Sequence, residues 1–214
     1  VPERHAISKL ANLHLVTTTA SRDRLIRMGE QGNSIHVVGA PGLDGLTDLA
    51  TMSRAQLCGQ VGLDPLRPLA LLVFHPVLSE ASEARQQILN LLEAAFLRGF
   101  QVVAVMPNSD AGSDEIRQVL QHESQAGNIV LYTHLPRSEF VSWMAVVDVM
   151  LGNSSSGILE SATFGTPVVN VGSRQNLRER NPNVIDVQGD VTETCAALEL
   201  SQKLGRYSPS NLYA

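Results

Sequence analysis

Apolar runs that alternate with amphipathic segments fill the chain from residue 69 to residue 204 and constrain its fold more than any other feature. The runs contain few polar residues and lie at 69–74, 102–106, 128–132, 146–151, 167–171 and 184–187. The intervening segments with helical spacing lie at about 79–98, 113–123, 137–145, 155–164 and 191–204. A strand buried on both faces reads as a continuous apolar run, and a parallel neighbour needs a crossover helix. The sequence therefore predicts an α/β fold, a Rossmann-like parallel sheet with helices on both faces.

The residues before this alternation predict a different part of the molecule. Helices are expected at 4–12 and 21–30, and strands at 13–19 and 35–38. Two strands do not make an independently stable sheet, so we expect the end of another Rossmann-like domain there. The predicted organisation is thus a domain remnant at 1–46, a connecting segment at 47–68 that ends in a proline-rich stretch, and a ligand-binding Rossmann-like domain at 69–214.

Composition excludes several classes of protein. The 214 residues are 43% hydrophobic and 17% charged, with a net charge of −5 and no Lys/Arg blocks, which argues against nucleic acid as a partner. No apolar run reaches the roughly 18 residues of a membrane span, and no secretory signal is present, so we expect a cytoplasmic protein. Cys58 and Cys195 fit no metal-binding or redox spacing. We expect neither a metal nor a cofactor.

The turn Gly152-Asn153-Ser154-Ser155-Ser156-Gly157 follows one apolar run and opens a helix. Its hydroxyls and the unpaired N–H groups of a helix start suit a phosphate or diphosphate. Glu160 lies about one and a half turns further on, where a carboxylate can accept hydrogen bonds from sugar or ribose hydroxyls. The structural alternative is an ordinary N-cap, which the same residues also form.

Polar residues also follow the other predicted strands. His75 comes after the strand at 69–74, Asn108 and Asp110 after the next, His134 after the third and Arg174 after the fifth. Because the carboxyl ends of parallel strands meet at one edge of the sheet, these residues are candidates for a common site. Each has a structural alternative: a capped core histidine, Asx-turn residues, a loop residue that contributes only backbone, and a surface arginine.

Three common motifs are missing. The chain has no GxxxxGK[ST] phosphate loop, no GxGxxG after the strand at 69–74 and no Gly-x-Ser-x-Gly around Ser154 and Ser155. Nucleoside triphosphate chemistry, dinucleotide binding and a serine-hydrolase triad are therefore disfavoured.

With these residues in view, the chain resembles the hydrolysing UDP-N-acetylglucosamine 2-epimerases. The matching segments occur in the family's order over about 175 residues and are specific as a set. They are Arg4-His5-Ala6-Ile7-Ser8-Lys9-Leu10, Gly39-Ala40-Pro41-Gly42-Leu43-Asp44, His75-Pro76-Val77, Met106 to Ser113, His134-Leu135-Pro136, Gly152 to Glu160, Phe164 to Asn170, and Gly172-Ser173-Arg174-Gln175.

The resemblance implies one half of a glycosyltransferase-B-type fold, in which two Rossmann-like domains close on a UDP-sugar. It assigns the diphosphate to Ser154 and Ser155, the ribose hydroxyls to Glu160 and the uracil to the backbone around His134. It also implies that His75, Asn108 and Arg174 line the nucleotide-sugar cleft, with His75 as the candidate catalytic residue.

The implied reaction converts UDP-N-acetylglucosamine into N-acetylmannosamine and UDP through a 2-acetamidoglucal, a step of sialic acid biosynthesis. The implied ligand is UDP-N-acetylglucosamine or UDP, and the complete protein is expected to be a homo-oligomer. Two departures matter: Leu177 stands where the family often has Gly, and the region of the family's catalytic carboxylates has no counterpart. We therefore expect this chain to bind nucleotide without turnover. Two other functions stay open, the donor half of a glycosyltransferase and a non-catalytic UDP-sugar-binding module.

Overall fold

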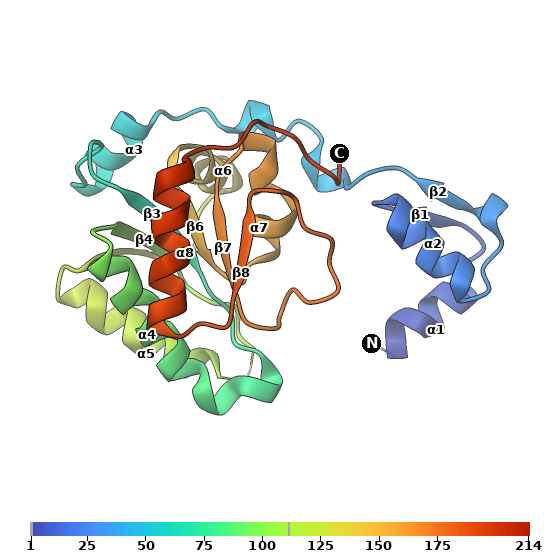
Figure 1. Ribbon diagram of the computed structural model, residues 1–214, viewed down its shortest axis with the longest axis horizontal. Coiled ribbons are helices and arrows are strands. Elements are labelled where there is room, and N and C mark those ends of the chain that lie inside the picture. Colours follow the sequence, from blue (N-terminus) through green and yellow to red (C-terminus); the bar gives the residue numbers. More distant parts are fainter. Residues whose placement is uncertain (1, 111) are drawn as a thin grey trace. The chain divides into compact units, whose positions relative to one another are not determined.

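The computed structural model describes residues 2–110 and 112–214 (Figure 1). Contacts divide the chain into two compact units, one of residues up to Gly45 together with Asn211–Ala214, the other Leu46–Ser210. The boundaries 1–46, 47–68 and 69–214 stay a prediction. In the structure, residues 47–68 pack with the larger unit, since α3 (Arg54–Val61) buries Leu57 and Cys58 in its core.

The larger unit contains a six-stranded sheet in the order β5-β4-β3-β6-β7-β8, and every pair of neighbours is parallel. Its strands are β3 (Leu69–Val73), β4 (Gln101–Val105), β5 (Ile129–Tyr132), β6 (Val149–Gly152), β7 (Val168–Val171) and β8 (Val184–Val187). The chain builds outward from β3 to β5, then crosses back and builds outward from β6. The predicted Rossmann-like fold is confirmed, and the direction of winding reverses between β3 and β6, where such sheets bind ligands.

Helices cover both faces of this sheet (Figure 1). One face carries α4 (Ala84–Leu97), α5 (Ser113–Gln125) and α8 (Val191–Leu204); the other carries α3, α6 (Arg137–Val146) and α7 (Ser155–Leu159). Along β3, Ala70 and Leu72 belong to the core on the α4 side, while Leu71 and Val73 belong to the core on the α6 side. All five residues of β3 are buried, which explains its continuous apolar sequence.

The predicted helix at 155–164 is wrong in one respect, because it breaks near Glu160. The α-helix α7 ends at Leu159, and a 3-10 helix covers Ser161–Phe164. Polar side chains bind helix carbonyls in this segment: Ser161 Oγ donates to Gly157 O at 2.6 Å, and Asn181 Nδ2 donates to Ile158 O at 3.2 Å. These bonds let the chain tighten without leaving carbonyls unpaired.

The predicted strand at 146–151 begins later than expected. Val146 completes α6, and β6 starts at Val149. Between them, the Asp148 carboxylate accepts from Leu69 N and from Arg54 Nη2, both at 2.8 Å. Asp148 therefore joins α3 to the start of β3. Its carboxylate lies before the amino-terminal end of β6 and not inside a strand.

The smaller unit contains α1 (Pro2–Leu10), β1 (His14–Val16), α2 (Thr19–Arg27) and β2 (Ile35–Val37), with β1 parallel to β2. The predicted strand 13–19 is shorter because Thr18 is the N-cap of α2. Residues 211–214 pack here, and Ala40 N donates to Tyr213 O at 2.6 Å. Apolar side chains on this unit are exposed, among them Leu15 and Val37.

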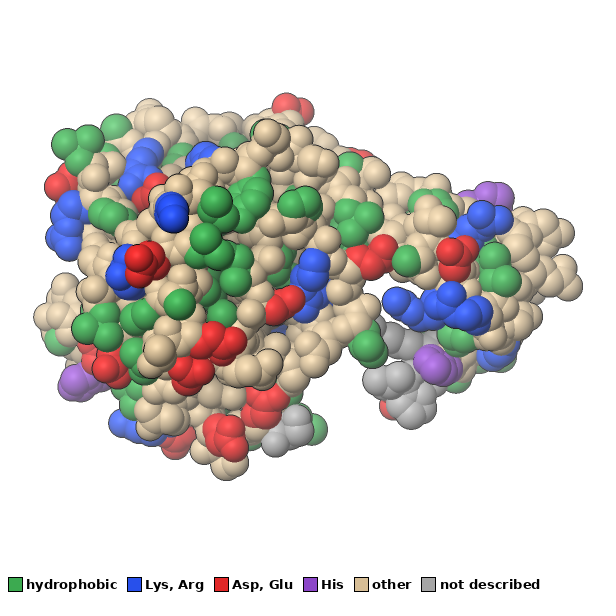
Figure 2. Space-filling view, in the orientation of Figure 1, with side chains coloured by type: hydrophobic (Ala, Val, Ile, Leu, Met, Phe, Trp, Pro, Cys, Tyr) green, Lys and Arg blue, Asp and Glu red, His purple; other side chains and the backbone are tan. Residues whose placement is uncertain are grey.

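The described residues contain neither a candidate membrane span nor a candidate metal cluster. No helix in residues 2–110 and 112–214 is long and apolar enough to cross a membrane. Within the same residues, no group of three or more His, Cys, Asp and Glu side chains is placed to hold a metal ion. On the face of the larger unit shown in Figure 2, basic side chains stand among acidic and apolar ones instead of forming one continuous area.

Candidate functional site

The loops after β3 and β6 are joined by one side chain, that of Asn153. Its Oδ1 accepts from the backbone N–H of His75, and its Nδ2 donates to the His75 carbonyl, each at 2.8 Å. Asn153 is 1% exposed, so both bonds are shielded from water. The two loops that flank the switch point are therefore held in a fixed register.

Gly152 makes this close approach possible. Its φ is +127°, and a Cβ atom at this position would lie 2.2 Å from the carbonyl oxygen of Val73. No other residue type fits, because any side chain would begin inside the neighbouring strand. The glycine thus brings the serine turn against the end of β3.

The loop after β7 binds the same turn. Arg174 Nη1 and Gln175 Nε2 donate to the Asn153 carbonyl at 3.1 and 2.8 Å. Arg180 stabilises this loop by donating from Nη1 to Gln175 O, at 2.9 Å, and from Nε to the Asp186 carboxylate. Burial lowers the pKa of Arg174, which Asp110 partly counteracts, yet a guanidinium stays charged in proteins. A cation is therefore fixed beside the serine turn.

The His75 ring is a half-buried, neutral group. Its Nδ1 accepts from the backbone N–H of Asn108 at 3.2 Å, and a backbone amide can only donate, so the ring proton belongs on Nε2. Burial, with a smaller contribution from the Arg174 charge, lowers the pKa of His75 to about 4. At neutral pH, His75 is thus an uncharged donor through Nε2.

The loop after β4 is fixed from within and from α5. Asn108 Nδ2 donates to the Asp110 carboxylate, a bond between two side chains and not the side-chain-to-backbone bond of an Asx turn. Arg117 Nη2, on α5, donates to Pro107 O at 2.8 Å and to Asn108 O at 3.2 Å. Asn108 is exposed and contributes its backbone N–H to His75.

Ser154 and Ser155 lie at the start of α7. Ser154 is the N-cap, with its Oγ accepting from Ser156 N at 3.3 Å and lying 2.8 Å from Ser156 Oγ. Ser155 is the first helical residue, and both serines are half-buried. The N-cap interpretation is thus observed, while their binding of a diphosphate stays a prediction.

Glu160 and His134 belong to the other end of α7 and to the loop after β5. Glu160 is the C-cap of α7, and its Oε2 accepts from Arg137 Nη1 at 2.8 Å. His134 is exposed, and the following Leu135 is buried in the core on the α6 side. The ribose role of Glu160 and the uracil role of the His134 backbone stay predictions.

Asn153 is hydrogen-bonded to two of the seven candidate residues, His75 and Arg174. Asn108 is hydrogen-bonded to His75, and Ser154 follows Asn153 in the chain. Sequence reasoning missed the parts played by Asn153, Gln175 and Arg137. Asn153 and Gln175 stand beside residues that were singled out, so adjacency was an available signal. No such signal existed for Arg137, because its partner Glu160 lies 23 residues away on another element.

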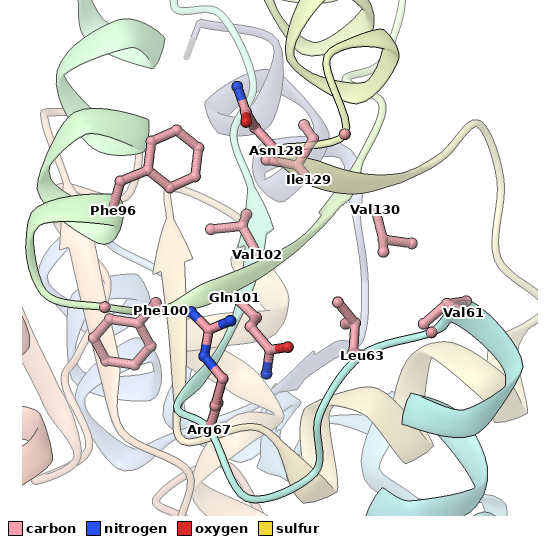
Figure 3. A pocket seen from close by; sticks show the side chains of 13 residues that line it. Val61, Leu63, Arg67, Phe96, Phe100, Gln101, Val102, Asn128, Ile129 and Val130 are labelled. Carbon is pink, nitrogen blue, oxygen red and sulfur yellow. The ribbon is translucent and has the colours of Figure 1, made fainter.

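A pocket of about 790 Å³ lies elsewhere, at the amino-terminal edge of the sheet (Figure 3). Phe96, Phe100 and Gln101 line it, and Arg67 is the one ionisable residue among its lining. Parallel sheets bind ligands at the opposite edge, and this pocket offers no set of converging charged groups. We therefore place the candidate site at the switch point, despite the volume of this pocket.

The chemistry of the switch point is that of an anion site next to an acceptor. Arg174, the serine hydroxyls and the Nε2–H of His75 are donors, and donors held in place stabilise negative charge that develops on an oxygen. Glu160 is the acceptor on the far end of α7. This combination suits a ligand with a phosphate at one end and hydroxyls at the other.

Known proteins with similar sequences point to one family. The family model described as UDP-N-acetylglucosamine 2-epimerase matches residues 2–213. A UDP-N,N'-diacetylbacillosamine 2-epimerase (hydrolyzing) from Legionella pneumophila is 46% identical over 203 residues, which are 95% of this chain and 53% of that protein. A UDP-N-acetylglucosamine 2-epimerase from Neisseria meningitidis is 30% identical over 210 residues, 98% of this chain and 55% of that protein. The chain thus spans about half the length of these relatives.

A solved structure shares the fold. The crystal structure of UDP-GlcNAc 2-epimerase from Neisseria meningitidis bound to UDP-GlcNAc matches with a TM-score of 0.76 at 18% identity, over 97% of this chain and 59% of that one. The resemblance inferred from the motifs is confirmed. The chain belongs to the UDP-N-acetylglucosamine 2-epimerase family.

Proposed function

We propose that this chain supplies the UDP-binding half of a hydrolysing UDP-N-acetylglucosamine 2-epimerase. The observation that carries the proposal is the family match over residues 2–213, combined with a switch point where donors surround the serine turn. In the proposed reaction, the sugar loses its C2 proton while the C1–O bond to UDP breaks, giving a 2-acetamidoglucal. Water then adds across the C1–C2 double bond with inversion at C2, giving N-acetylmannosamine.

In this proposal the diphosphate binds at the start of α7. Ser154 and Ser155 donate hydroxyl hydrogen bonds, and Arg174 contributes a positive charge that Asn153 O holds in place. Glu160 accepts from the ribose hydroxyls, and the backbone around His134 contacts the uracil. Asn108 borders the cleft through the loop that also supports His75.

His75 is proposed to stabilise UDP as it departs. The ring is neutral at pH 7 and carries its proton on Nε2, so it donates a hydrogen bond without bringing a second cation beside Arg174. Charge that grows on a phosphate oxygen strengthens such a bond, and this favours bond cleavage over substrate binding.

The finer context of the function is also a proposal. N-acetylmannosamine is a precursor for sialic acid, so we place the reaction in that biosynthesis and in the cytoplasm. We expect the complete protein to be a homo-oligomer with UDP-N-acetylglucosamine or UDP as its ligand. A glycosyltransferase would instead need an acceptor for sugar transfer, and it would form no N-acetylmannosamine.

The 46% identity to the Legionella protein favours a second substrate, UDP-N,N'-diacetylbacillosamine. The UDP half of both substrates is the same, so the site described above serves either. The experiment is to give a chain with the relatives' length each sugar nucleotide and to identify the free sugar by NMR. The preferred substrate is the one with the higher kcat/KM.

The UDP site itself is tested by calorimetric titration of the 214-residue chain with UDP. Replacing Ser155 by Ala removes one hydroxyl donor to the phosphates, and a hydrogen bond to a charged group is worth about 1.5–3 kcal/mol, or roughly 10–100-fold in affinity. The matched control is Ser124→Ala, also half-buried but near the end of α5. UDP binding that Ser155→Ala leaves unchanged contradicts the assignment of the diphosphate, and no UDP binding by the unaltered chain contradicts the proposal.

A further inference from the structure

An ion pair joins two segments of the site that the chain keeps apart. Arg137, the first residue of α6, donates from Nη1 to Glu160 Oε2 at 2.8 Å. The Glu160 side chain is 17% exposed and that of Arg137 is 45% exposed, so the carboxylate is the more enclosed partner. The pair therefore links the loop after β5 to the helix after β6.

The backbone on both sides of this ion pair is anchored. Leu135, two residues before Arg137, is buried in the core, and Glu160 N donates to Ser156 O at 2.9 Å. Ser161, which follows Glu160, is fully buried and receives a hydrogen bond from Asn183 Nδ2 at 2.8 Å. What the backbone leaves undetermined is the rotamer of the flexible Glu160 side chain, and Arg137 determines it.

We propose that Arg137 is a positioning residue that presents the Glu160 carboxylate to the ribose of the bound nucleotide and so sets a preference for ribose over 2'-deoxyribose. This inference rests on the proposed function. With Oε2 held by Arg137, Oε1 is the oxygen that faces a ribose hydroxyl. Arg137 follows His134-Leu135-Pro136 directly, so the same contact keeps the proposed uracil loop and the ribose acceptor at a fixed separation.

A purely structural ion pair makes a different prediction. A partly exposed pair contributes little to stability, and its loss would affect every ligand of the site equally. A positioning role affects only ligands that carry the hydroxyl which Glu160 accepts from. The ratio of the two affinities therefore separates the two roles.

The experiment titrates the 214-residue chain with UDP and with 2'-deoxy-UDP. The unaltered chain is expected to bind UDP about tenfold more tightly, because the deoxy ligand lacks the hydroxyl donor for the largely enclosed Oε1 of Glu160. Arg137→Met keeps the aliphatic stem and removes the charge; it should weaken UDP about fivefold, leave 2'-deoxy-UDP within twofold and nearly abolish the preference. Arg137→Lys should restore part of it.

Two further variants complete the test. Glu160→Gln should lower the preference as Arg137→Met does, and the double variant should be no worse than Glu160→Gln alone. Arg98→Met is the control, since it removes an ion pair with Glu199 (3.1 Å) that joins α4 to α8. Melting curves confirm that each variant is folded.

Each remaining outcome has one meaning. If Arg137→Met weakens both ligands equally, Arg137 has a structural role and the inference is wrong. If the unaltered chain binds UDP and 2'-deoxy-UDP equally well, Glu160 does not accept from the 2'-hydroxyl, and the inference fails while UDP binding stands. If the unaltered chain binds neither nucleotide, the proposed UDP site is wrong, and the inference that rests on it is wrong as well.

Discussion

At His75, burial and one hydrogen bond act on the same ring. The Asn108 amide fixes which nitrogen is protonated, and burial keeps the ring uncharged at neutral pH. A charged imidazolium beside Arg174 would repel it and would lose the bond from the amide, since Nδ1 could no longer accept. The neutral form is therefore built into the fold.

This neutrality predicts a pH dependence of stability. The pKa of His75 is about 4 in the folded chain and about 6.5 when unfolded, so the unfolded chain takes up the proton first. The stabilisation is fully present above pH ~6.5 and is lost as the pH falls towards ~4. We expect a loss of about 2 kcal/mol, because the half-buried ring keeps some contact with solvent.

Urea denaturation at pH 7 and pH 5 measures this effect in the unaltered chain and in His75→Asn, whose amide oxygen keeps an acceptor for Asn108. The carboxylates titrate in both proteins, so the difference between the two pH slopes isolates the histidine. The unaltered chain should lose more stability between these pH values. If the free energy of unfolding changed equally with pH in both proteins, the pKa of His75 would not be lowered in the folded chain.

Gly152 gives a second prediction at this scale. Gly152→Ala places a Cβ 2.2 Å from Val73 O at a φ that side chains rarely adopt, and we expect a destabilisation of at least about 3 kcal/mol. Gly59→Ala is the matched control, because Gly59 lies inside α3 with open space around its Cβ position. That change should stabilise the protein by up to about 1 kcal/mol. Denaturation midpoints compare the two, and similar midpoints would contradict the close approach of β6 to β3.

The sequence was informative about these residues only in part. Polar residues after apolar runs identified His75, Ser154 and Arg174 as candidates. The link from Asn153 to His75 could not be found in this way, because the two are 78 residues apart and meet only if β3 and β6 are neighbours. Sequence spacing indicates which strands exist, but not the order in which they pair.

Among the elements, the loop between β7 and β8 carries the clearest sign of strain. Leu177 has a φ of 70°, a left-handed conformation that costs a residue with a Cβ about 1 kcal/mol or more, and its side chain is 90% exposed. The resemblance had already marked this position, where the family often has Gly. At this position the chain thus keeps a left-handed conformation, which glycine adopts without strain.

Leu177→Gly should therefore stabilise the chain by about 0.5–1 kcal/mol, because relief of the left-handed strain exceeds the added freedom of the unfolded chain. Leu177→Ala is the control: it removes the same exposed side chain but keeps the Cβ, and it should give no gain. Thermal melts measure both. A gain with alanine as large as with glycine would locate the effect in the exposed leucine and not in the backbone.

The elements themselves were largely predictable, and two of the exceptions involve polar side chains that bind the backbone or one another. The helix starting at 155 was expected to continue to 164, but Ser161 and Asn181 bind carbonyls that a longer α-helix would use. The strand expected from Val146 starts late because Asp148 binds Arg54 and Leu69. Periodicity predicts elements from apolar positions, and it does not register competition from polar side chains, whether these lie in the same segment, as Ser161 does, or in a distant one, as Asn181 does.

For the molecule as a whole, the two units differ in how deeply their strands are buried. All residues of β3 and β6 are buried, whereas β1 and β2 each bury one residue. Amides of β1 and β2 should therefore exchange with solvent deuterium many-fold faster than those of β3 and β6, since local opening exposes little apolar surface. Hydrogen exchange with mass spectrometry measures this, and equal protection in the two sheets would contradict it.

Activity is the second prediction for the whole molecule. In the proposed function, the residues at the switch point supply donors for departing UDP, and none of the residues assigned to the site is the base for C2. Proton removal at C2 needs a positioned base. We expect the 214-residue chain to bind UDP without releasing it from UDP-N-acetylglucosamine, and a chain with the relatives' length to release it. A coupled UDP assay measures both, and turnover by the shorter chain would overturn this expectation.

The amide of Asn153, held at both ends by the backbone of His75, has a consequence for engineering. A chimaera that takes the serine turn from a relative with altered sugar preference also needs residues 73–76 of that relative. Without them, the amide at position 153 lacks the backbone partners that it has here at His75. The two loops should therefore be exchanged together, although Asn153 and His75 lie 78 residues apart in the sequence.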